Sequence, residues 1–395
     1  MKKKINIIEK LIDELCSEGV EFKELGELGN LYGGLTGKSK DDFSNGNAKF
    51  ITYMNIFSNI AVDVDVAIFV KMETNEKQNK IQYGDVLFTG SSETPDECGM
   101  SSVLTKKIDE PLYLNSFCFG FRFNDHNLLL PEFSKYLFRD EKVRKQIAKT
   151  ASGVTRFNIS KKRFAKIKIP IPPLPLQEAI VKVLDTFTEL EAELEAELEA
   201  RKKQYEYYRD KALTFDEVKV PFSDLGDVYG FQYGMGNTIP KTGGNFPVYG
   251  SNGIVGTHHE YNSEDSPVIG HIGAYAGIVN WGTGKHFVTY NGVICNLKNG
   301  IDARFGYHLL KKQNLIEIAK SSSHPFVSYG KLKSVQVQVP DINIQKEIGK
   351  LLDKFDALVN DISIGLPAEL KARRQQYEYY REKLLTFKEK TLSKK

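Results

Sequence analysis

The segment Arg201-Lys-Lys-Gln-Tyr-Glu-Tyr-Tyr-Arg-Asp-Lys-Ala-Leu-Thr-Phe215 decides the fold, because it returns later as Arg373-Arg-Gln-Gln-Tyr-Glu-Tyr-Tyr-Arg-Glu-Lys-Leu-Leu-Thr-Phe387. Eleven of the 15 aligned positions are identical, at an offset of 373 − 201 = 172 residues. In a chain of 395 residues, this period is far too long for a solenoid and indicates two copies of a whole module. Such a chain is expected to engage a partner that carries two related sites.

The repeat extends upstream at a second offset, since Ile159-Ser160 matches Val327-Ser328 at a distance of 327 − 159 = 168 residues. Six further pairs share this offset: Leu174 and Ile342, Gln177 and Gln345, Ile180 and Ile348, Leu184 and Leu352, Asp185 and Asp353, and Phe187 and Phe355. The second copy therefore has 172 − 168 = 4 extra residues in its helical part, about one turn. Gly and Pro in Ile364-Gly-Leu-Pro367 predict a kink or break there.

Charge is nearly balanced over the whole chain but unevenly distributed along it. The net charge is 54 − 51 = +3, yet residues 133–168 hold 12 basic and 2 acidic side chains, a local charge of +10. Residues 177–200 hold 8 acidic side chains and one Lys, a local charge of −7. The first block suits contact with phosphates, whereas the second is expected to face away from nucleic acid or to lie against a partner.

The cysteines and the N-terminal segment indicate the compartment. Cys16, Cys98, Cys118 and Cys295 lie far apart without a CxxC pair, which argues against a zinc knuckle or a disulfide framework and suits a reducing cytosol. The first residues, Met-Lys-Lys-Lys, are followed by an amphipathic segment and not by a continuous apolar run. We therefore expect a cytoplasmic protein without a signal peptide or a membrane span.

Globular and helical sections alternate along the chain. Short β-type runs between Gly and Asn turns fill residues 22–130 and 217–339, while long helices are predicted over residues 176–214 and 344–385. This order predicts an α+β protein with two β-rich globular domains that alternate with two long helices. The predicted sections are 1–170, 171–215, 216–340 and 341–395.

The two long helices share an apolar seam with a spacing of three to four residues. Two such helices, separated by a compact domain, predict an antiparallel coiled coil with the globular domains at its ends, related by a pseudo-twofold axis. The alternative is two ordinary surface helices, each packed on its own domain.

Motifs for catalysis, nucleotide binding or metal binding are missing. Only three residues separate Gly33 from the Gly37-Lys-Ser39 tripeptide, where a phosphate-binding P-loop needs four. The seven histidines show no H-x-x-x-H or H-E-x-x-H spacing. We therefore expect a binding protein with no catalytic residue, no metal site and no cofactor; the alternative of an undetected nuclease would be revealed by metal-dependent cleavage by the purified chain.

The candidate DNA contacts lie in loops. Lys38 and Lys40 are candidates for the DNA backbone, and small hydroxyl residues with Lys or Arg suit phosphate contacts in residues 150–163. Histidines in loops rich in Gly, Asn and Tyr suit base edges. The full predicted set is Lys38, Lys40, Thr89, Ser91, Ser92, Thr155, Arg156, Lys161, Lys162, Gln232, Asn237, Asn252, His258, His271, Tyr275, Lys285, His286, Asn291, Ser322 and His324.

The chain resembles the specificity subunit of type I restriction–modification systems over nearly its whole length. The resemblance is carried by Leu11-Ile-Asp-Glu-Leu-Cys16, Gly19-Val-Glu-Phe22, Gly84-Asp-Val-Leu-Phe88, Ile169-Pro-Ile-Pro-Pro-Leu-Pro-Leu-Gln177, Gly365-Leu-Pro-Ala-Glu369 and the two Tyr-Glu-Tyr-Tyr-Arg blocks. It implies that residues 1–170 and 216–340 are target recognition domains, each of which binds one half of a bipartite site in double-stranded DNA. The helices would set the gap and dock two methyltransferase subunits, which carry S-adenosylmethionine.

The resemblance also implies a restriction/translocase subunit that uses ATP and Mg²⁺, while this chain itself would bind no cofactor. Tyr207, Arg209, Tyr379 and Arg381 are then the predicted contacts to the methyltransferase. The alternative is that tyrosines of these blocks are simply helix–helix core. A rival function is a scaffold or decoy that binds the methyltransferase without recognising a DNA sequence.

Residues 189–200 are three copies of Glu-Leu-Glu-Ala, which is also an ordinary helix-favouring composition. As a spacer, each four-residue unit adds about 6 Å and about 40° of net rotation. A helix of about 39 residues is about 58 Å long, which corresponds to about 17 base pairs. Residues 189–200 are therefore a candidate ruler for the gap between the half-sites.

Overall fold

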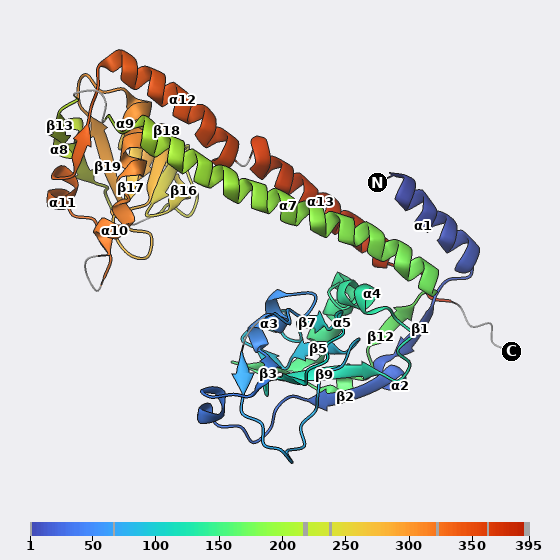
Figure 1. The fold of residues 1–395 in the computed structure, drawn as a ribbon. Coiled ribbons are helices and arrows are strands. Elements are labelled where there is room, and N and C mark those ends of the chain that lie inside the picture. The colour runs from blue at the N-terminus through green and yellow to red at the C-terminus, as the bar shows by residue number, and fades with distance from the viewer. Residues whose placement is uncertain are drawn as a thin grey trace. The chain divides into compact units, whose positions relative to one another are not determined.

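The computed structural model describes residues 2–65, 68–215, 220–236, 239–320, 324–361 and 363–390, with side chains from residue 6 onward. It divides into two compact units (Figure 1). Unit 1 consists of Met1–Ala192 and Ala372–Lys395, and unit 2 consists of Glu193–Lys371. The unit boundaries fall inside both helical sections, so each unit contains parts of both copies of the repeat.

Unit 1 contains a four-stranded sheet in the order β2-β9-β5-β7, flanked by smaller sheets. Its elements are α1 Lys2–Leu15, β1 Glu21–Glu24, α2 Leu25–Leu28, β2 Gly29–Gly33, η1 Lys40–Phe43, β3 Ala48–Ile51, α3 Tyr53–Ser58, β4 Phe69–Val70, β5 Val86–Thr89, β6 Ser91–Ser92, β7 Ser101–Val103, β8 Leu112–Leu114, β9 Cys118–Phe123, α4 Pro131–Leu137, α5 Glu141–Thr150, β10 Ala151–Ser152, β11 Phe157–Ile159, α6 Lys161–Phe164 and β12 Lys168–Ile171. Phe88, Phe119 and Phe164 pack ring against ring in its core, with centroids 4.9–5.3 Å apart.

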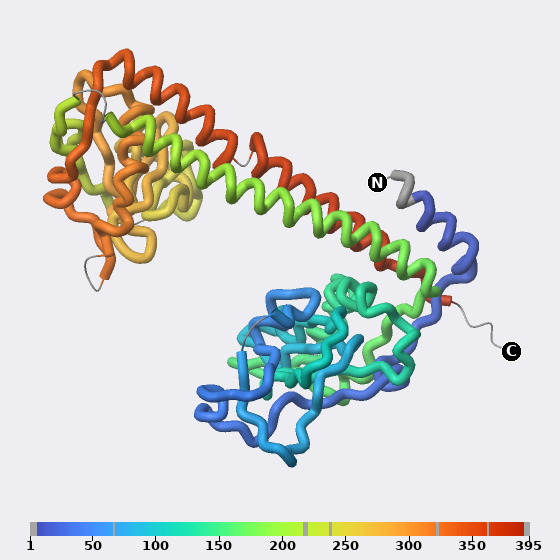
Figure 2. The backbone as a smooth tube through the Cα atoms, viewed as in Figure 1, coloured from blue at the N-terminus to red at the C-terminus, as the bar shows by residue number. Residues whose placement is uncertain are grey.

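Unit 2 contains a six-stranded sheet in the order β14-β19-β17-β18-β15-β16. Its elements are β13 Phe222–Asp224, α8 Leu225–Val228, β14 Tyr229–Tyr233, β15 Phe246–Gly250, β16 Gly253–His258, β17 Ser263–Gly270, β18 Val279–Val288, β19 Gly292–Leu297, α9 Ala303–Lys312, α10 Leu315–Ala319, α11 Tyr329–Lys333, β20 Gln336–Gln338 and α12 Ile342–Asn360. Helices α7, Leu174–Ala212, and α13, Gly365–Leu385, belong partly to each unit. Figure 2 follows the same backbone as a tube.

The two units repeat one plan at the level of strand register. In unit 1, Gly29 of β2 is opposite Phe123 of β9, and in unit 2 Tyr229 of β14 is opposite Leu297 of β19. Directly after β2 and directly after β14, the chain passes close to a backbone carbonyl group. A Cβ on Gly34 would lie 2.0 Å from the Asn115 oxygen, and one on Gly234 would lie 2.1 Å from the Thr289 oxygen. Only glycine fits at either position, so the same close approach is built twice.

A buried glutamine joins each helical section to its globular domain. Gln177 accepts from the Leu130 amide at 2.8 Å and donates to the Pro172 and Leu128 carbonyls at 2.7 and 3.0 Å. Gln345 accepts from the Asp302 amide at 2.8 Å and donates to the carbonyls of Pro340 and Gly300 at 2.8 and 3.3 Å. The pair found at the offset of 168 therefore makes equivalent contacts in both units.

The helices pair in antiparallel fashion. In unit 1, Glu191 of α7 bonds to Arg374 of α13 at 2.6 Å, whereas the earlier residue Phe187 stacks on the later residue Tyr380 with centroids 5.5 Å apart. In unit 2, Phe355 of α12 stacks on Tyr208 of α7 with centroids 6.4 Å apart. Each copy's phenylalanine thus contacts the other copy's repeated tyrosine. This exchange of partners confirms antiparallel pairing and excludes two independent surface helices.

The predicted break in the second helical section is confirmed. Helix α12 ends at Asn360 and α13 begins at Gly365, which has a φ of +65°. Pro367 lies in the first turn of α13, where a missing amide hydrogen costs no helical bond. Helix α7 contains no Gly, and its single proline, Pro175, lies in its first turn, so this helix is continuous over 39 residues (Figure 1).

The helix–domain joint of unit 2 contains a buried histidine. His308 is 0% exposed, and its Nε2 lies 2.7 Å from Asp353 Oδ1 while its Nδ1 lies 3.1 Å from the Tyr205 hydroxyl. Burial lowers the pKa of His308 to about 4, although Asp353 acts in the opposite direction. The ring is therefore neutral at pH 7, with Nε2–H donating to Asp353 and Nδ1 accepting from Tyr205. In unit 1 Tyr136 takes this place and donates to Asp185 at 2.6 Å.

The four cysteines are buried and unpaired, and burial raises the pKa of Cys118 to about 12. Among the described helices, none combines the length and the apolar character needed to cross a membrane. Within the described ranges, no group of three or more His, Cys, Asp or Glu side chains is placed to hold a metal ion.

Candidate nucleic-acid interface

A cavity of about 490 Å³ opens on unit 1 where four segments meet, and we call it the first cavity. Its walls are α3, the segment that begins with β6, the loop between β8 and β9, and the loop between β10 and β11. The strands explain why these segments meet, since Ser91 and Ser92 of β6 pair with Asn158 and Phe157 of β11. The lining residues are Tyr53, Met54, Phe57, Ser91, Ser92, Glu93, Glu97, Phe117, Thr155 and Arg156.

Four of the predicted contacts meet in this cavity, namely Ser91, Ser92, Thr155 and Arg156. Arg156 is held on two sides. Its Nε donates to Ser91 Oγ at 3.0 Å, and its guanidinium carbon lies 5.6 Å from the centroid of the Phe117 ring. These two contacts restrict the rotamer of Arg156 and engage its Nε and one face of its guanidinium group.

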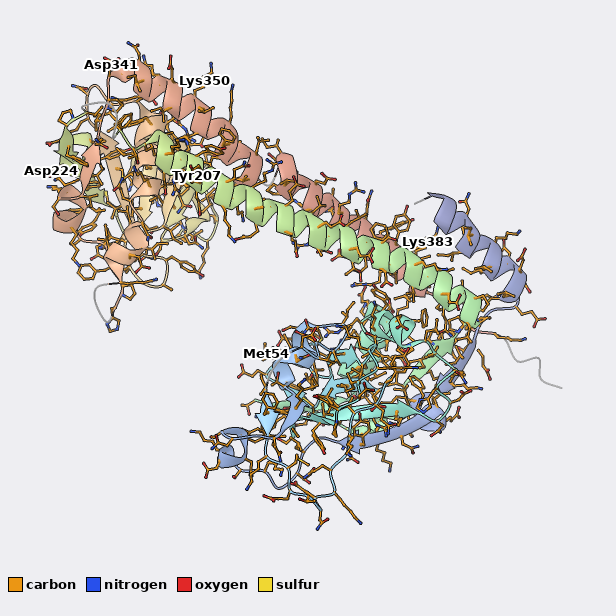
Figure 3. The ribbon with its side chains drawn as sticks, viewed as in Figure 1. Met54, Tyr207, Asp224, Asp341, Lys350 and Lys383 are labelled. Atoms are coloured by element: carbon orange, nitrogen blue, oxygen red, sulfur yellow. The ribbon has the colours of Figure 1, made fainter. Side chains whose placement is uncertain are left out.

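The cavity has acidic and apolar walls as well as a basic one. Glu97 Oε2 accepts from the hydroxyls of Thr94 and Ser92 at 2.9 and 3.3 Å, which fixes this carboxylate. Met54 and Phe117 are each 60% exposed, so apolar surface borders the polar groups. Figure 3 labels Met54 on α3. Sequence reasoning missed both residues, because neither an exposed aromatic ring in a loop nor one exposed Met on a short helix gives a periodic signal.

Some of the other predicted contacts of unit 1 are exposed, whereas others already bond to groups within the protein. Lys40, Lys161 and Lys162 are exposed. Lys38 is not free, because its ammonium pairs with Glu76 at 2.5 Å and donates to the Lys71 carbonyl at 2.6 Å. Thr89 is 0% exposed and its hydroxyl accepts from the Met100 amide. We therefore leave Lys38 and Thr89 out of the proposed interface.

Much of the basic block 133–168 also serves the fold. Arg139 donates to the carbonyls of Ser101, Ile56, Phe57 and Asn59, and burial lowers its pKa to about 10. Arg144 donates to the carbonyls of Asp96, Cys98 and Gly99. The local charge of +10 thus overstates the surface that can meet phosphates, because charge counting does not register internal carbonyl partners.

Unit 2 places His324 where unit 1 places Arg156. The Ile159 amide donates to the Gly90 carbonyl at 3.0 Å, and the Val327 amide donates to the His271 carbonyl at 2.9 Å. Ile159 lies three positions after Arg156, and Val327 lies three positions after His324. The described part of the second loop, from His324 onward, therefore occupies a place equivalent to that of Arg156 and the residues after it in unit 1.

The predicted contacts of unit 2 are spread over its loops and strands. Gln232, Asn252, Tyr275, Lys285 and His324 are exposed, and His258 and Asn291 are partly buried. His271 and His286 are buried, and burial lowers the pKa of His286. We therefore leave these two histidines out of the proposed interface. Asn237 and Ser322 lie outside the described residues.

An aromatic cluster forms around Tyr233, the last residue of β14. Tyr233 stacks on Tyr329 with centroids 3.9 Å apart and on His271 with centroids 4.2 Å apart. Tyr290, which is 44% exposed, lies 5.1 Å from His271. His271 therefore packs against Tyr233 and the exposed Tyr290. Tyr233, Tyr290 and Tyr329 are not among the predicted contacts, because the Gly-, Asn- and Tyr-rich composition of this region does not indicate which rings stack on one another.

Of the predicted partner contacts, the two tyrosines are exposed, whereas Arg209 and Arg381 are partly buried. Tyr207 and Tyr379 are 62% and 61% exposed, and Figure 3 labels Tyr207 on α7. Arg209 lies over the Tyr205 ring at 5.8 Å, and Arg381 lies over the Tyr377 ring at 5.4 Å. Within each block, then, some tyrosines pack in the helix pair while another faces solvent, and the two interpretations of the blocks apply to different residues.

The sequence is similar to those of two specificity subunits from Escherichia coli. The chain is 37% identical over 220 residues to the type I restriction enzyme EcoprrI specificity subunit of Escherichia coli, covering 51% of this chain and 55% of that one. It is 34% identical over 263 residues to the EcoR124I/EcoR124II specificity subunit of Escherichia coli, covering 57% and 64%. These alignments span about half to two thirds of the relatives' lengths.

Solved structures agree on the fold. A crystal structure of a type I restriction–modification S subunit from M. genitalium matches with a TM-score of 0.55 and 19% identity, covering 93% of this chain and 96% of that one. A second solved structure comes from work on complex assembly and conformational transition of the type I R-M system. One of its chains matches with a TM-score of 0.61 and 16% identity, covering 93% of this chain and 97% of that one. The model of the type I restriction modification DNA specificity domain matches residues 17–200 and 217–372. The chain belongs to this family and carries its domain twice.

Proposed function

We propose that this chain is the non-catalytic DNA sequence-recognition subunit of a cytoplasmic type I restriction–modification complex. Each β-rich domain recognises one half of a bipartite site in double-stranded DNA. The main support is the duplication of one plan, with the loops of Arg156 and His324 at equivalent positions, because two similar domains suit two separated half-sites. Exposed Lys40, Lys161 and Lys162 provide contacts to the DNA backbone.

The helices set the gap and dock the catalytic partners. Helix α7 runs unbroken through all three Glu-Leu-Glu-Ala units, which supports a rigid spacer. The exposed rings of Tyr207 and Tyr379, one in each repeat, provide equivalent docking points for two methyltransferase subunits. A restriction/translocase subunit completes the complex. S-adenosylmethionine, ATP and Mg²⁺ belong to these partners and not to this chain.

The test is a methylation map of genomic DNA from cells that express this chain with its cognate methyltransferase, compared with cells that lack this chain. The expected result is a split motif with modified adenines that disappears in the control. If both proteins are soluble and associated but no motif appears, the chain is the scaffold or decoy that binds the methyltransferase without recognising sequence.

A further inference from the structure

The first cavity contains the guanidinium group of Arg156, which neighbouring residues hold in place while its terminal nitrogens stay available for a ligand. Arg156 is fixed through Nε by Ser91 and through its planar face by Phe117. In the described part of the chain, its two terminal nitrogens donate no hydrogen bond and its charge has no carboxylate partner within ion-pair distance. Such an arginine presents two parallel N–H donors in a fixed direction.

The charges around Arg156 favour a base edge over a phosphate. Glu93 and Glu97 share the cavity with the single arginine, so its lining carries a formal charge of 1 − 2 = −1. A phosphate would be repelled by this surplus, whereas a base pair offers both acceptors and donors. Guanine presents O6 and N7 as two acceptors in the major groove, and cytosine presents the N4 amino group as a donor.

We propose, on the basis of the recognition function above, that Arg156 recognises guanine in a G·C pair of the half-site bound by unit 1. Its terminal nitrogens donate to O6 and N7, and the Glu97 carboxylate, held by Thr94 and Ser92, accepts from the cytosine amino group. Ser91 and Phe117 are positioning residues that fix the guanidinium. The equivalent residue of unit 2 is His324, so the two half-sites are not required to match at this position.

The experiment is a methylation map of a randomised DNA library with the reconstituted complex of full-length chain and methyltransferase. Arg156→Ala is expected to lower discrimination at one G·C position of one half-site by about 5- to 150-fold, leaving the other half-site and the gap unchanged. The matched control is Lys162→Ala, which removes an exposed cation outside the cavity. It is expected to lower methylation uniformly and to keep the motif.

Ser91→Ala tests the positioning role, with an expected loss of about 5-fold at the same base pair. If Arg156→Ala abolishes methylation, Arg156→Lys decides, because it keeps the charge and loses the paired donors; guanine discrimination should fall while other positions stay fixed. An unchanged motif, a change in both half-sites, or a wild-type half-site without a G·C pair overturns the proposal. A wild-type complex without any motif would instead refute the recognition function itself.

Discussion

Gln345 offers the sharpest test of how each helical section is joined to its domain. Its buried amide bonds to the Asp302 amide, the Pro340 carbonyl and the Gly300 carbonyl at 2.8, 2.8 and 3.3 Å. Gln345→Ala removes all three bonds and leaves backbone groups without partners. At about 1 kcal/mol for each bond, we expect a loss of about 3 kcal/mol in the free energy of unfolding of unit 2. For an m-value of about 3 kcal/mol/M, the urea midpoint falls by about 1 M.

The assay uses the only tryptophan of the chain, Trp281, which lies in β18 of unit 2. Its fluorescence therefore reports the unfolding of that unit. Gln345→Leu keeps the side-chain volume but none of the hydrogen bonds, so it should lose as much stability as the Ala variant. The matched control is Gln177→Ala, the same change in unit 1, which should leave the tryptophan midpoint in place.

Two results would refute this reasoning. A wild-type midpoint for Gln345→Leu would mean that volume, and not hydrogen bonding, is what the buried position requires. An equal shift for Gln177→Ala would mean that the two units unfold as a single cooperative body.

Three further predictions concern acid, docking and spacing. The folded-state pKa of His308 is about 4 and its reference value is 6.5, so the stability it contributes is present above pH 6.5 and falls by up to about 3 kcal/mol as the pH drops towards 4; His308→Asn should abolish this loss in tryptophan-detected urea midpoints. Tyr207→Ala with Tyr379→Ala should weaken methyltransferase binding at least about tenfold, as measured by calorimetry, without lowering the melting temperature, and unweakened binding would contradict the docking role. Deleting Glu193–Ala196 should shorten the mapped gap by one or two base pairs and preserve both half-sites; an unaltered gap would rule out the ruler.

The repeat predicted much of the fold because equivalent contacts require equivalent residues. Gln177 with Gln345, and Phe187 with Phe355, were paired by offset alone, and each pair makes the same kind of contact in both units. Gly and Pro in Ile364-Gly-Leu-Pro367 predicted the break before Gly365. The shared seam also predicted the antiparallel pairing of the two helical sections, but local pattern could not reveal where the two units divide, because that boundary depends on contacts between distant segments.

The candidate site was predictable only in part. Ser91 and Arg156 were chosen for their chemistry, and the strands bring them into contact. Lys38 and His286 were chosen on the same grounds, yet internal partners or burial occupy them. A side chain's identity states what it can bond, whereas its partner depends on the tertiary environment. Phe117 was missed for the converse reason, since its role arises from the arginine that lies over it.

Unit 1 is built from two separate stretches of the chain, which affects the order in which the two units can fold during translation. The Val20 amide donates to the Lys388 carbonyl at 2.7 Å, and the Lys390 amide donates to the Val20 carbonyl at 2.9 Å, so a segment translated after unit 2 bonds to one translated before it. Unit 2 is a continuous stretch, Glu193–Lys371, and can close while the ribosome is still at work. We expect ribosome-bound chains halted soon after unit 2 has emerged to resist protease there and to be cleaved in unit 1. Synthesis of unit 1 thus begins before that of unit 2, but unit 1 is completed after it.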